Sequence, residues 1–392
     1  MPDVFISRQP LVNRQSKIIA NRLTLHFIDG ATTRDGASAL GALLEFWPES
    51  EKLVFIDCAG TPCDAKLLDW AMPANATLEV TSSSLLDGEN SAEFIDVLKS
   101  AQPSLCLVFD KQAGAAISTG VPFRFIGFDA QTYTTEQLKV LSVKTQPYGI
   151  AVATRVYDAP GFQSCLDAGI SAAASWFFKQ STKAPAKALN PGQAQIVRVL
   201  NLVRKNAEIR DIEAALKQDV ALSYKLLRYI NSAGFGLSCE IQSFRHAVTI
   251  LGYDKLNKWL SLLLATASKD PMAPALMHTA LTRAKLMEEL AHGLVDRQEY
   301  DNLFITGAFS MLDVLLGVSM DKVLESMSLP EPISDALLGN GGIYGPFLDL
   351  ARISEGEDGQ AIADHAAMLG LSAEQFNSAQ LKALSFADTM EL

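Results

Sequence analysis

The chain contains five cysteines, a residue type that can bind zinc, form disulfides or act as a nucleophile. Their odd number and scattered spacing disfavour a disulfide framework. Cys58 and Cys63 are too far apart for a Cys-x-x-Cys pair, and no histidine lies near them in the sequence. We therefore interpret the cysteines as free thiols rather than as a zinc site. They are Cys58, Cys63, Cys106, Cys165 and Cys239.

Short motifs for nucleophilic and nucleotide chemistry are absent from the sequence. It contains no Gly-x-Ser-x-Gly elbow, no P-loop and no Gly-x-Gly-x-x-Gly run. The glycine-rich residues 339–342 follow a predicted helix and lack a partner lysine. We interpret them as a turn, with anion binding as the minor alternative.

The formal net charge of −11 argues against general binding to nucleic-acid phosphates. Basic residues outnumber acidic ones between residues 183 and 262, which allows a local basic patch, but solvated helix faces are the favoured interpretation. No apolar run approaches the roughly 18 residues that span a membrane. The first residues also lack the pattern of a secretory signal. We therefore expect a cytoplasmic protein without membrane insertion.

The first 180 residues alternate between short apolar runs and helical stretches. Helical patterns between the apolar runs include residues 91–99 and 135–142. Apolar strands that alternate with helices are typical of a parallel sheet covered by helices. The candidate strands are rich in β-branched or aromatic residues and cover residues 53–56, 77–80, 105–109, 123–128 and 149–153.

The pattern changes after residues 181–189, a polar, proline-containing segment that we interpret as a linker. From residue 190 onward the apolar spacing is almost only helical. The sequence thus predicts an α/β domain over residues 1–180 and an all-α domain over residues 190–392. Predicted helices of the second domain include residues 276–294, 300–316 and 319–328.

Two blocks in the helical half, residues 218–233 and 243–252, carry a recognisable signature. Their composition, order and spacing closely resemble the HDOD domain, a catalytically silent relative of the HD phosphohydrolases. HD enzymes bind metal through histidines and an adjacent His-Asp pair. Ser310 and Met311 occupy the position of that pair, and neither replaces a metal ligand of that kind. His278 and His292 are therefore interpreted as capping or packing histidines.

The opening residues 5–15 resemble the start of EAL domains that occur fused to HDOD domains. Active EAL domains hydrolyse cyclic di-GMP with two divalent metals. Elsewhere in the first half the likeness lies in the overall layout, which implies a TIM-like barrel. The first half is shorter than a usual EAL barrel, so an incomplete barrel is an open alternative.

The EAL resemblance also implies where metal-binding residues should fall. Arg22 occupies the position of the glutamate that names the family, and Phe109 occupies the first position of a pair of aspartates. The late glutamates are absent from residues 153–157. A cation opposes divalent binding and phenylalanine offers no donor, so we expect a degenerate site and no enzyme activity.

Four carboxylates remain at positions that the resemblance assigns, and they could still bind one hard cation through oxygen. Carboxylates at strand ends also cap helices and pair with arginines, and Arg22 and Arg155 are the candidate partners. We favour this structural role and therefore expect no catalytic residue, cofactor or metal. The carboxylates are Asp57, Glu79, Asp110 and Asp129.

If neither domain is catalytic, the chain can still act through binding at its surfaces. The resemblance implies a signal-transduction adaptor or scaffold that acts through other signalling proteins, with self-association left open. One alternative is a receptor that binds cyclic di-GMP without hydrolysing it, and a weaker one is residual metal-dependent phosphodiesterase activity. The lost ligand positions argue against cyclic di-GMP binding, and the net charge argues against nucleic acid.

Overall fold

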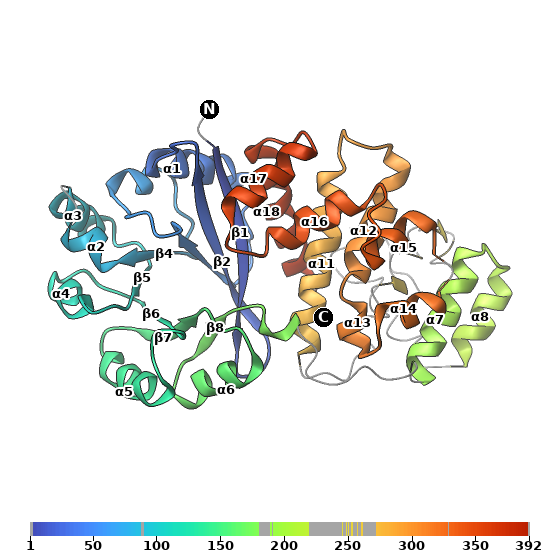
Figure 1. The fold of residues 1–392 in the computed structure, drawn as a ribbon, viewed down its shortest axis with the longest axis horizontal. Coiled ribbons are helices and arrows are strands. Elements are labelled where there is room, and N and C mark those ends of the chain that lie inside the picture. The colour runs from blue at the N-terminus through green and yellow to red at the C-terminus, as the bar shows by residue number, and fades with distance from the viewer. Residues whose placement is uncertain are drawn as a thin grey trace. The chain divides into compact units, whose positions relative to one another are not determined.

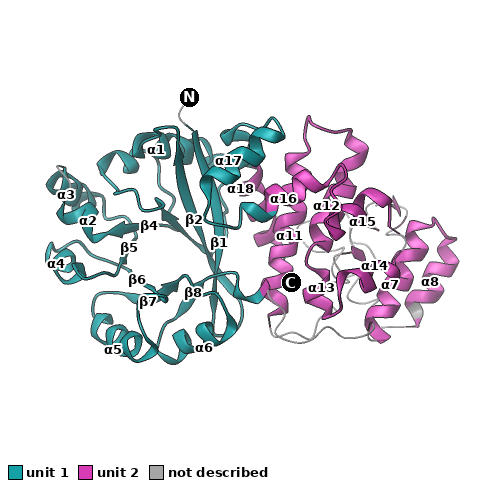
Figure 2. Cartoon of the chain, in the orientation of Figure 1, with its two compact units in different colours: residues 1–178, 352–378 teal, residues 179–351, 379–392 magenta. Residues whose placement is uncertain are grey.

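Contacts in the computed structural model divide the chain into two units (Figure 2). The first unit is Met1–Phe178 with Arg352–Ser378, and the second is Lys179–Ala351 with Ala379–Leu392. The predicted all-α domain had included Arg352–Ser378, which instead groups with the first unit. The structure describes residues 3–87, 90–179, 189, 191–218, 245, 248, 250, 252–253, 257, 260–261, 272–327 and 329–390.

Several predicted features fall outside the described residues. The linker over residues 181–189 is one, apart from Leu189. The first HDOD block is described only at Gln218, and the second only at residues 245, 248, 250 and 252.

Eight strands close into a barrel in chain order (Figure 1). The neighbouring pairs from β2 to β8 are parallel, whereas β1 is antiparallel to both β2 and β8. The barrel is therefore complete, and the alternative of an incomplete barrel is wrong. The strands are β1 Asp3–Asn13, β2 Ile18–Ile28, β3 Leu53–Asp57, β4 Ala76–Thr81, β5 Leu105–Val108, β6 Phe125–Asp129, β7 Ile150–Thr154 and β8 Ala172–Ala174.

The five strands predicted from apolar runs correspond to β3–β7, and three strands were missed. β1 and β2 form a hairpin whose turn is fixed by Asn13, because its Oδ1 accepts hydrogen bonds from the backbone N–H groups of Gln15 and Lys17, both at 3.0 Å. β8 consists of three alanines, a residue type with no preference for strands. The sequence therefore signals the β1–β2 hairpin and β8 only weakly, although β8 is the strand that closes the barrel on β1.

Helices and short 3₁₀ segments of the first unit lie outside the barrel (Figure 1). The barrel interior is filled at one level by an apolar cluster that includes Phe55, Cys106 and Phe125, with the two phenylalanine rings 5.0 Å apart. Alternate residues of a strand share a face, so inward residues further along the same strands point toward the barrel mouth. The helices are α1 Thr33–Ala42, α2 Ser82–Leu86, α3 Ser91–Ala101, α4 Ala113–Ser118, α5 Thr135–Thr145, α6 Ala159–Asp167 and α17 Gly359–Met368.

The described part of the second unit is helical, which confirms the predicted all-α half. The predicted helix over residues 300–316 is broken at Ser310 and Met311, where the Ser310 hydroxyl donates to the Gly307 carbonyl at 2.7 Å. The helices are α7 Pro191–Arg204, α8 Ile209–Lys217, α11 Ala273–Leu290, α12 Tyr300–Phe309, α13 Leu312–Leu316, α14 Met320–Glu325 and α15 Glu331–Leu338, with α16 Gly345–Ile353 and α18 Ala373–Thr389 each divided between the units.

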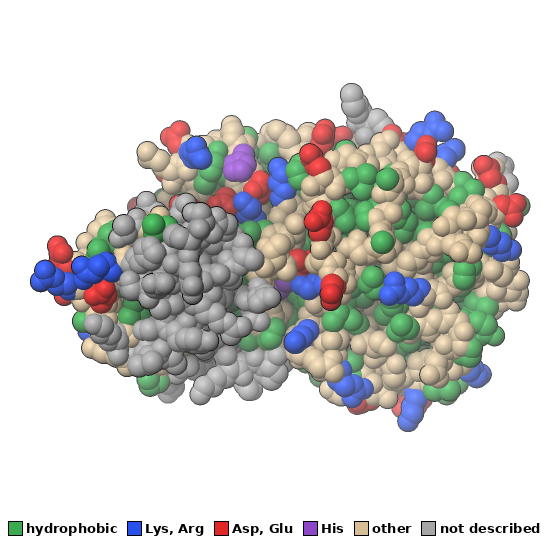
Figure 3. All heavy atoms as spheres, turned by 180° about the vertical axis from the view of Figure 1, so that it is seen from behind, with side chains coloured by type: hydrophobic (Ala, Val, Ile, Leu, Met, Phe, Trp, Pro, Cys, Tyr) green, Lys and Arg blue, Asp and Glu red, His purple; other side chains and the backbone are tan. Residues whose placement is uncertain are grey.

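Surface charge on the face shown in Figure 3 is mixed: acidic and basic side chains are interspersed over the described residues. Such mixing is typical of solvated surfaces. Among the helices that the structure describes, none combines the length and the apolar character needed to cross a membrane.

Candidate ligand-binding site at the barrel mouth

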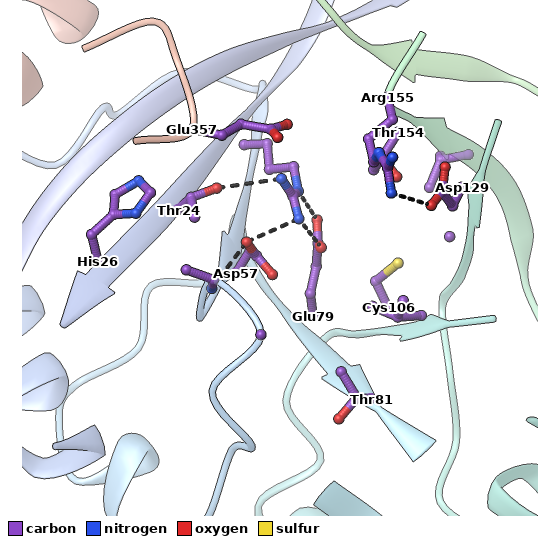
Figure 4. Close-up of a pocket in the computed structure, with 16 residues that line it drawn as sticks. Thr24, His26, Asp57, Glu79, Thr81, Cys106, Asp129, Thr154, Arg155 and Glu357 are labelled. Atoms are coloured by element: carbon purple, nitrogen blue, oxygen red, sulfur yellow. Dashed lines mark hydrogen bonds and ion pairs between the residues drawn. The ribbon is translucent and has the colours of Figure 1, made fainter. Parts of the chain in front are cut away.

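A pocket of about 370 Å³ opens where the parallel strands of the barrel end (Figure 4). The carboxyl ends of β2–β7 converge there, because all of these strands run in one direction. Binding sites in barrels of alternating strands and helices lie at this end. The charged side chains of its lining are Arg22, Asp57, Glu79, Asp129, Arg155 and Glu357.

Arg22 of β2 joins two of the predicted carboxylates. Its Nε and Nη2 donate to the two carboxylate oxygens of Glu79 at 2.8 and 2.9 Å, which is the bidentate geometry of a strong arginine–carboxylate pair. Its Nη2 also lies 3.0 Å from Asp57 Oδ2, and its Nη1 donates to Thr24 Oγ1 at 3.3 Å. Glu79 and Asp57 come from β4 and β3, so one cation bridges three strands.

The side chains of Arg22 and Glu79 are only 13% and 5% exposed, so burial has the largest single effect on the pKa of each group. Burial raises the pKa of Glu79, and the charge of Arg22 opposes this rise. Burial also lowers the pKa of Arg22, but the charges of Glu79 and Asp57 outweigh it and leave that pKa raised. Arg22 is therefore a permanent cation that keeps two buried carboxylates compatible with the fold.

Asp129 and Arg155 form a second ion pair at the mouth, separated in Figure 4 from Asp57 and Glu79. Arg155 Nη1 donates to Asp129 Oδ2 at 2.8 Å, and the Arg155 side chain is 48% exposed. Arg155 has a φ of +56°, a conformation that costs energy for a residue other than glycine and is enriched at functional sites. This arginine is thus held at the mouth while its guanidinium remains reachable from solvent.

The structure brings three of the four predicted carboxylates to one pocket and separates the fourth. Asp110 does not line the pocket and instead accepts hydrogen bonds from the Ser82 hydroxyl at 2.6 Å and the Gln112 backbone N–H at 2.8 Å. The predicted pairing of strand-end carboxylates with Arg22 and Arg155 is confirmed by the ion pairs.

Divalent metals are implied by the EAL resemblance, but the donor set as it lies does not fit them. Asp57 and Glu79 share Arg22 as their ion-pair partner, and Asp129 pairs with Arg155. In the part of the chain that the structure describes, no group of three or more His, Cys, Asp or Glu side chains is placed to hold a metal ion. We therefore assign no chemistry at this pocket to a metal.

His26 and Glu357 line the pocket, and neither was anticipated from the sequence as a site residue. His26 follows Thr24 on the inward face of β2, and its Nε2 lies 2.8 Å from Ser7 Oγ. Glu357 lies more than 180 residues beyond the last barrel strand in the sequence, so no local signal could have placed it here. Arg22, Thr24 and His26 are alternate residues of one strand and so share a face, and this pattern could have indicated His26 from the sequence.

Burial lowers the pKa of His26, against the attraction of Asp57, Asp358 and Glu357. A histidine whose pKa is lowered on folding stabilises the fold above its unfolded value of 6.5, and this contribution is lost as the pH falls through its folded pKa. We expect the wild-type chain to lose more stability on acidification below pH 6.5 than His26→Gln does. Urea unfolding at pH values on either side of 6.5 measures this difference, and parallel losses would contradict it.

In the helical unit, an arginine contacts the two residues at the position assigned to the His-Asp pair. Arg283 Nη1 of α11 lies 2.9 Å from Ser310 Oγ and 3.0 Å from Met311 Sδ. His278 Nε2 lies 2.7 Å from Asp388 Oδ1, and His292 lies 3.6 Å from Glu289. The two histidines therefore have carboxylate partners within their own unit, and their packing or capping role stays a prediction.

Comparison with known proteins supports the HDOD assignment of the second half. Residues 191–320 match the HDOD domain family. The Cyclic di-GMP phosphodiesterase CdgJ of Vibrio cholerae is 29% identical over 233 residues, which cover 59% of this chain and 54% of the relative. The uncharacterized protein YuxH of Bacillus subtilis is 25% identical over 218 residues, which cover 54% of this chain and 53% of the relative. The chain thus spans about half the length of these curated relatives.

Solved structures similar to this chain include EAL proteins. The FimX EAL domain of Pseudomonas aeruginosa bound to c-di-GMP is 11% identical, with a TM-score of 0.35, and the match covers 45% of this chain and 90% of that one. The BlrP1 calcium/cy-diGMP complex of Klebsiella pneumoniae is 14% identical, with a TM-score of 0.36, covering 45% and 55%.

The chain therefore combines a closed eight-stranded barrel with residues 191–320, which match the HDOD domain family. The match confirms the predicted HDOD resemblance of the second half. The relative CdgJ is named a cyclic di-GMP phosphodiesterase, and this name contradicts two predictions made from the sequence. We expected no enzyme and argued against cyclic di-GMP binding, whereas a relative that is 29% identical over 59% of this chain is named a cyclic di-GMP phosphodiesterase. The sequence argument equated the loss of single metal ligands with the loss of the site, although a charged pocket persists at the mouth.

Proposed function

We propose that the barrel mouth binds cyclic di-GMP and that the chain acts in cyclic di-GMP signalling. The observation that carries this proposal is the charged pocket at the carboxyl ends of the strands, which holds two arginines and four carboxylates. The relative CdgJ, named for this dinucleotide, supports the identity of the ligand.

The two arginines of the pocket differ in their availability to a phosphate. Arg22 is buried and already bidentate to Glu79, so a phosphate would have to displace a strong pair. Arg155 is half exposed and holds Asp129 through one oxygen, a type of pair that contributes little in water. Arg155 is therefore the side chain that we assign to a phosphate of the dinucleotide.

Titration calorimetry with cyclic di-GMP tests the proposal. We expect the wild-type chain to bind and Arg155→Met to weaken binding about tenfold to a hundredfold, the value of a charge-assisted hydrogen bond. Lys139→Met, which removes an exposed cation of α5 that does not line the mouth, is the matched control and should bind normally. Absence of wild-type binding at millimolar ligand would overturn the proposal.

Hydrolysis is followed in the same samples because the relative is named a phosphodiesterase. Conversion of the cyclic to the linear dinucleotide by the wild-type chain, followed by chromatography, would add turnover to binding.

An adaptor role through protein–protein contacts stays a prediction of the sequence resemblance. Affinity purification from the native host, with the full chain as bait, tests it independently of the ligand.

A further inference from the structure

A segment near the C-terminus completes the exposed edge of β1. β8 pairs with β1 only at Leu11–Asn13, so the preceding residues of β1 have one edge without a neighbouring strand. Unpaired backbone groups at such an edge need other partners. The Asn377 side chain accepts from Ile6 N–H at 3.0 Å and donates to the Val4 carbonyl at 2.7 Å.

The same edge continues at Arg8, whose N–H donates to the Ser354 carbonyl at 3.1 Å. Val4, Ile6 and Arg8 alternate along the strand, so their backbone groups point to one side. Ser354 and Asn377 therefore supply hydrogen-bond partners along the part of the β1 edge that β8 does not pair. This contact places residues 354–359 beside the pocket.

Close packing holds this segment over β2. Gly359 begins α17, which packs on β1 and β2, and a Cβ at Gly359 would overlap the His26 side chain. Glu357, two residues earlier, lines the pocket together with Arg22 and Arg155. Its Oε1 accepts a hydrogen bond from Gln9 Nε2 at 3.2 Å, which positions an exposed carboxylate at the mouth.

An oriented carboxylate at this place suits one part of the proposed ligand. Guanine presents two neighbouring donors, N1–H and the 2-amino group, whereas adenine lacks that pair on the corresponding edge. A carboxylate has capacity for about four acceptor contacts, and the bond to Gln9 uses one of them. The other carboxylates of the lining are occupied by arginine, so Glu357 is the acidic side chain there with no arginine ion pair among the described residues.

We propose that Glu357 is a specificity-determining residue of the barrel-mouth pocket, delivered by the C-terminal segment, and that it recognises the donor edge of guanine. This rests on the proposed binding of cyclic di-GMP. It also makes the ligand site depend on residues that follow the HDOD match at 191–320.

Competition between cyclic di-GMP and cyclic di-AMP in titration calorimetry tests Glu357. For Glu357→Gln we expect the preference for the guanine ligand to fall about tenfold to a hundredfold, the value of a bidentate base contact. Asp364→Asn is the matched control, because it removes an exposed carboxylate of α17 that does not line the pocket. Thermal unfolding of both variants should match the wild type, since both side chains are exposed.

The possible outcomes distinguish a failure of the Glu357 role from a failure of the proposed cyclic di-GMP binding. If the wild-type chain binds neither dinucleotide, the proposed function fails. If the wild type binds cyclic di-GMP and Glu357→Gln keeps the full preference for it, the role of Glu357 is wrong and the proposed function stands. Equal weakening of both ligands would also overturn the role of Glu357, because it would show a contact that does not read the base.

Discussion

Replacing Arg22 with methionine is expected to lower the free energy of unfolding by about 3–5 kcal/mol, because it leaves buried carboxylates without their cation. The Glu79 side chain is 5% exposed and receives two of the Arg22 hydrogen bonds. Methionine fills a similar volume, so the loss reports charge and hydrogen bonding more than packing. Denaturant unfolding at neutral pH measures it.

The pH dependence of this loss identifies its cause. Burial already raises the pKa of Glu79 above 4.5, and removal of Arg22 removes the charge that opposes the rise. A carboxyl group whose pKa is raised on folding stabilises the fold below its unfolded pKa and loses that contribution as the pH rises through the folded value. The cost of Arg22→Met should therefore be smallest near pH 4.5 and largest at neutral pH.

Arg155→Met is the matched control for Arg22→Met, since it removes the other ion pair of the same pocket. Arg155 is half exposed, and exposed pairs contribute about 0–1 kcal/mol, so this variant should unfold almost as the wild type does. A loss for Arg22→Met that is equally small, or that does not change with pH, would show that the buried cluster is not held by its charges.

Replacing Gly307 with leucine is expected to destabilise the helical unit by about 3 kcal/mol, the upper end of the usual range for overpacking. A Cβ on Gly307 of α12 would lie 2.6 Å from Ala284 Cα and 2.7 Å from the Arg283 carbonyl carbon of α11. Backbone atoms cannot turn away as a flexible side chain can, so the two helices must separate. The change in midpoint and enthalpy by differential scanning calorimetry measures the effect.

Gly114→Leu provides the control for a glycine inside a helix. A Cβ at Gly114 of α4 meets no atom within 4 Å. The free energy of helix formation favours leucine over glycine by about 1 kcal/mol. This variant should be neutral or slightly stabilised. A Gly307→Leu protein with an unchanged transition would show that α11 and α12 do not approach as closely as the structure indicates.

Arginine side chains occupy or contact both positions that the family resemblances assign to metal binding. Arg22 bridges Asp57 and Glu79 in the barrel, and Arg283 contacts Ser310 and Met311 in the helical unit. The sequence showed the substitution at Arg22 directly, but Arg283 lies one helix away from Ser310 and only the packing of α11 against α12 reveals it. In the barrel, a guanidinium replaces the counter-charge that a cation would supply to buried oxygens.

The sequence by itself determined the elements that depend on local pattern. Apolar runs such as residues 53–56 and 105–109 predicted the parallel strands, and helical spacing predicted the second half. The barrel's completeness was not predictable, because β8 is three alanines whose role comes from closing the sheet on β1.

Only the tertiary structure decided the composition of the pocket. Asp57, Glu79 and Asp129 were named from the sequence, yet their ion pairs depend on strands that meet through the topology of the barrel. Glu357 reaches the mouth because the chain end satisfies the open edge of β1. A linear pattern records the neighbours of a residue along the chain, whereas charge pairing and edge completion depend on neighbours in space.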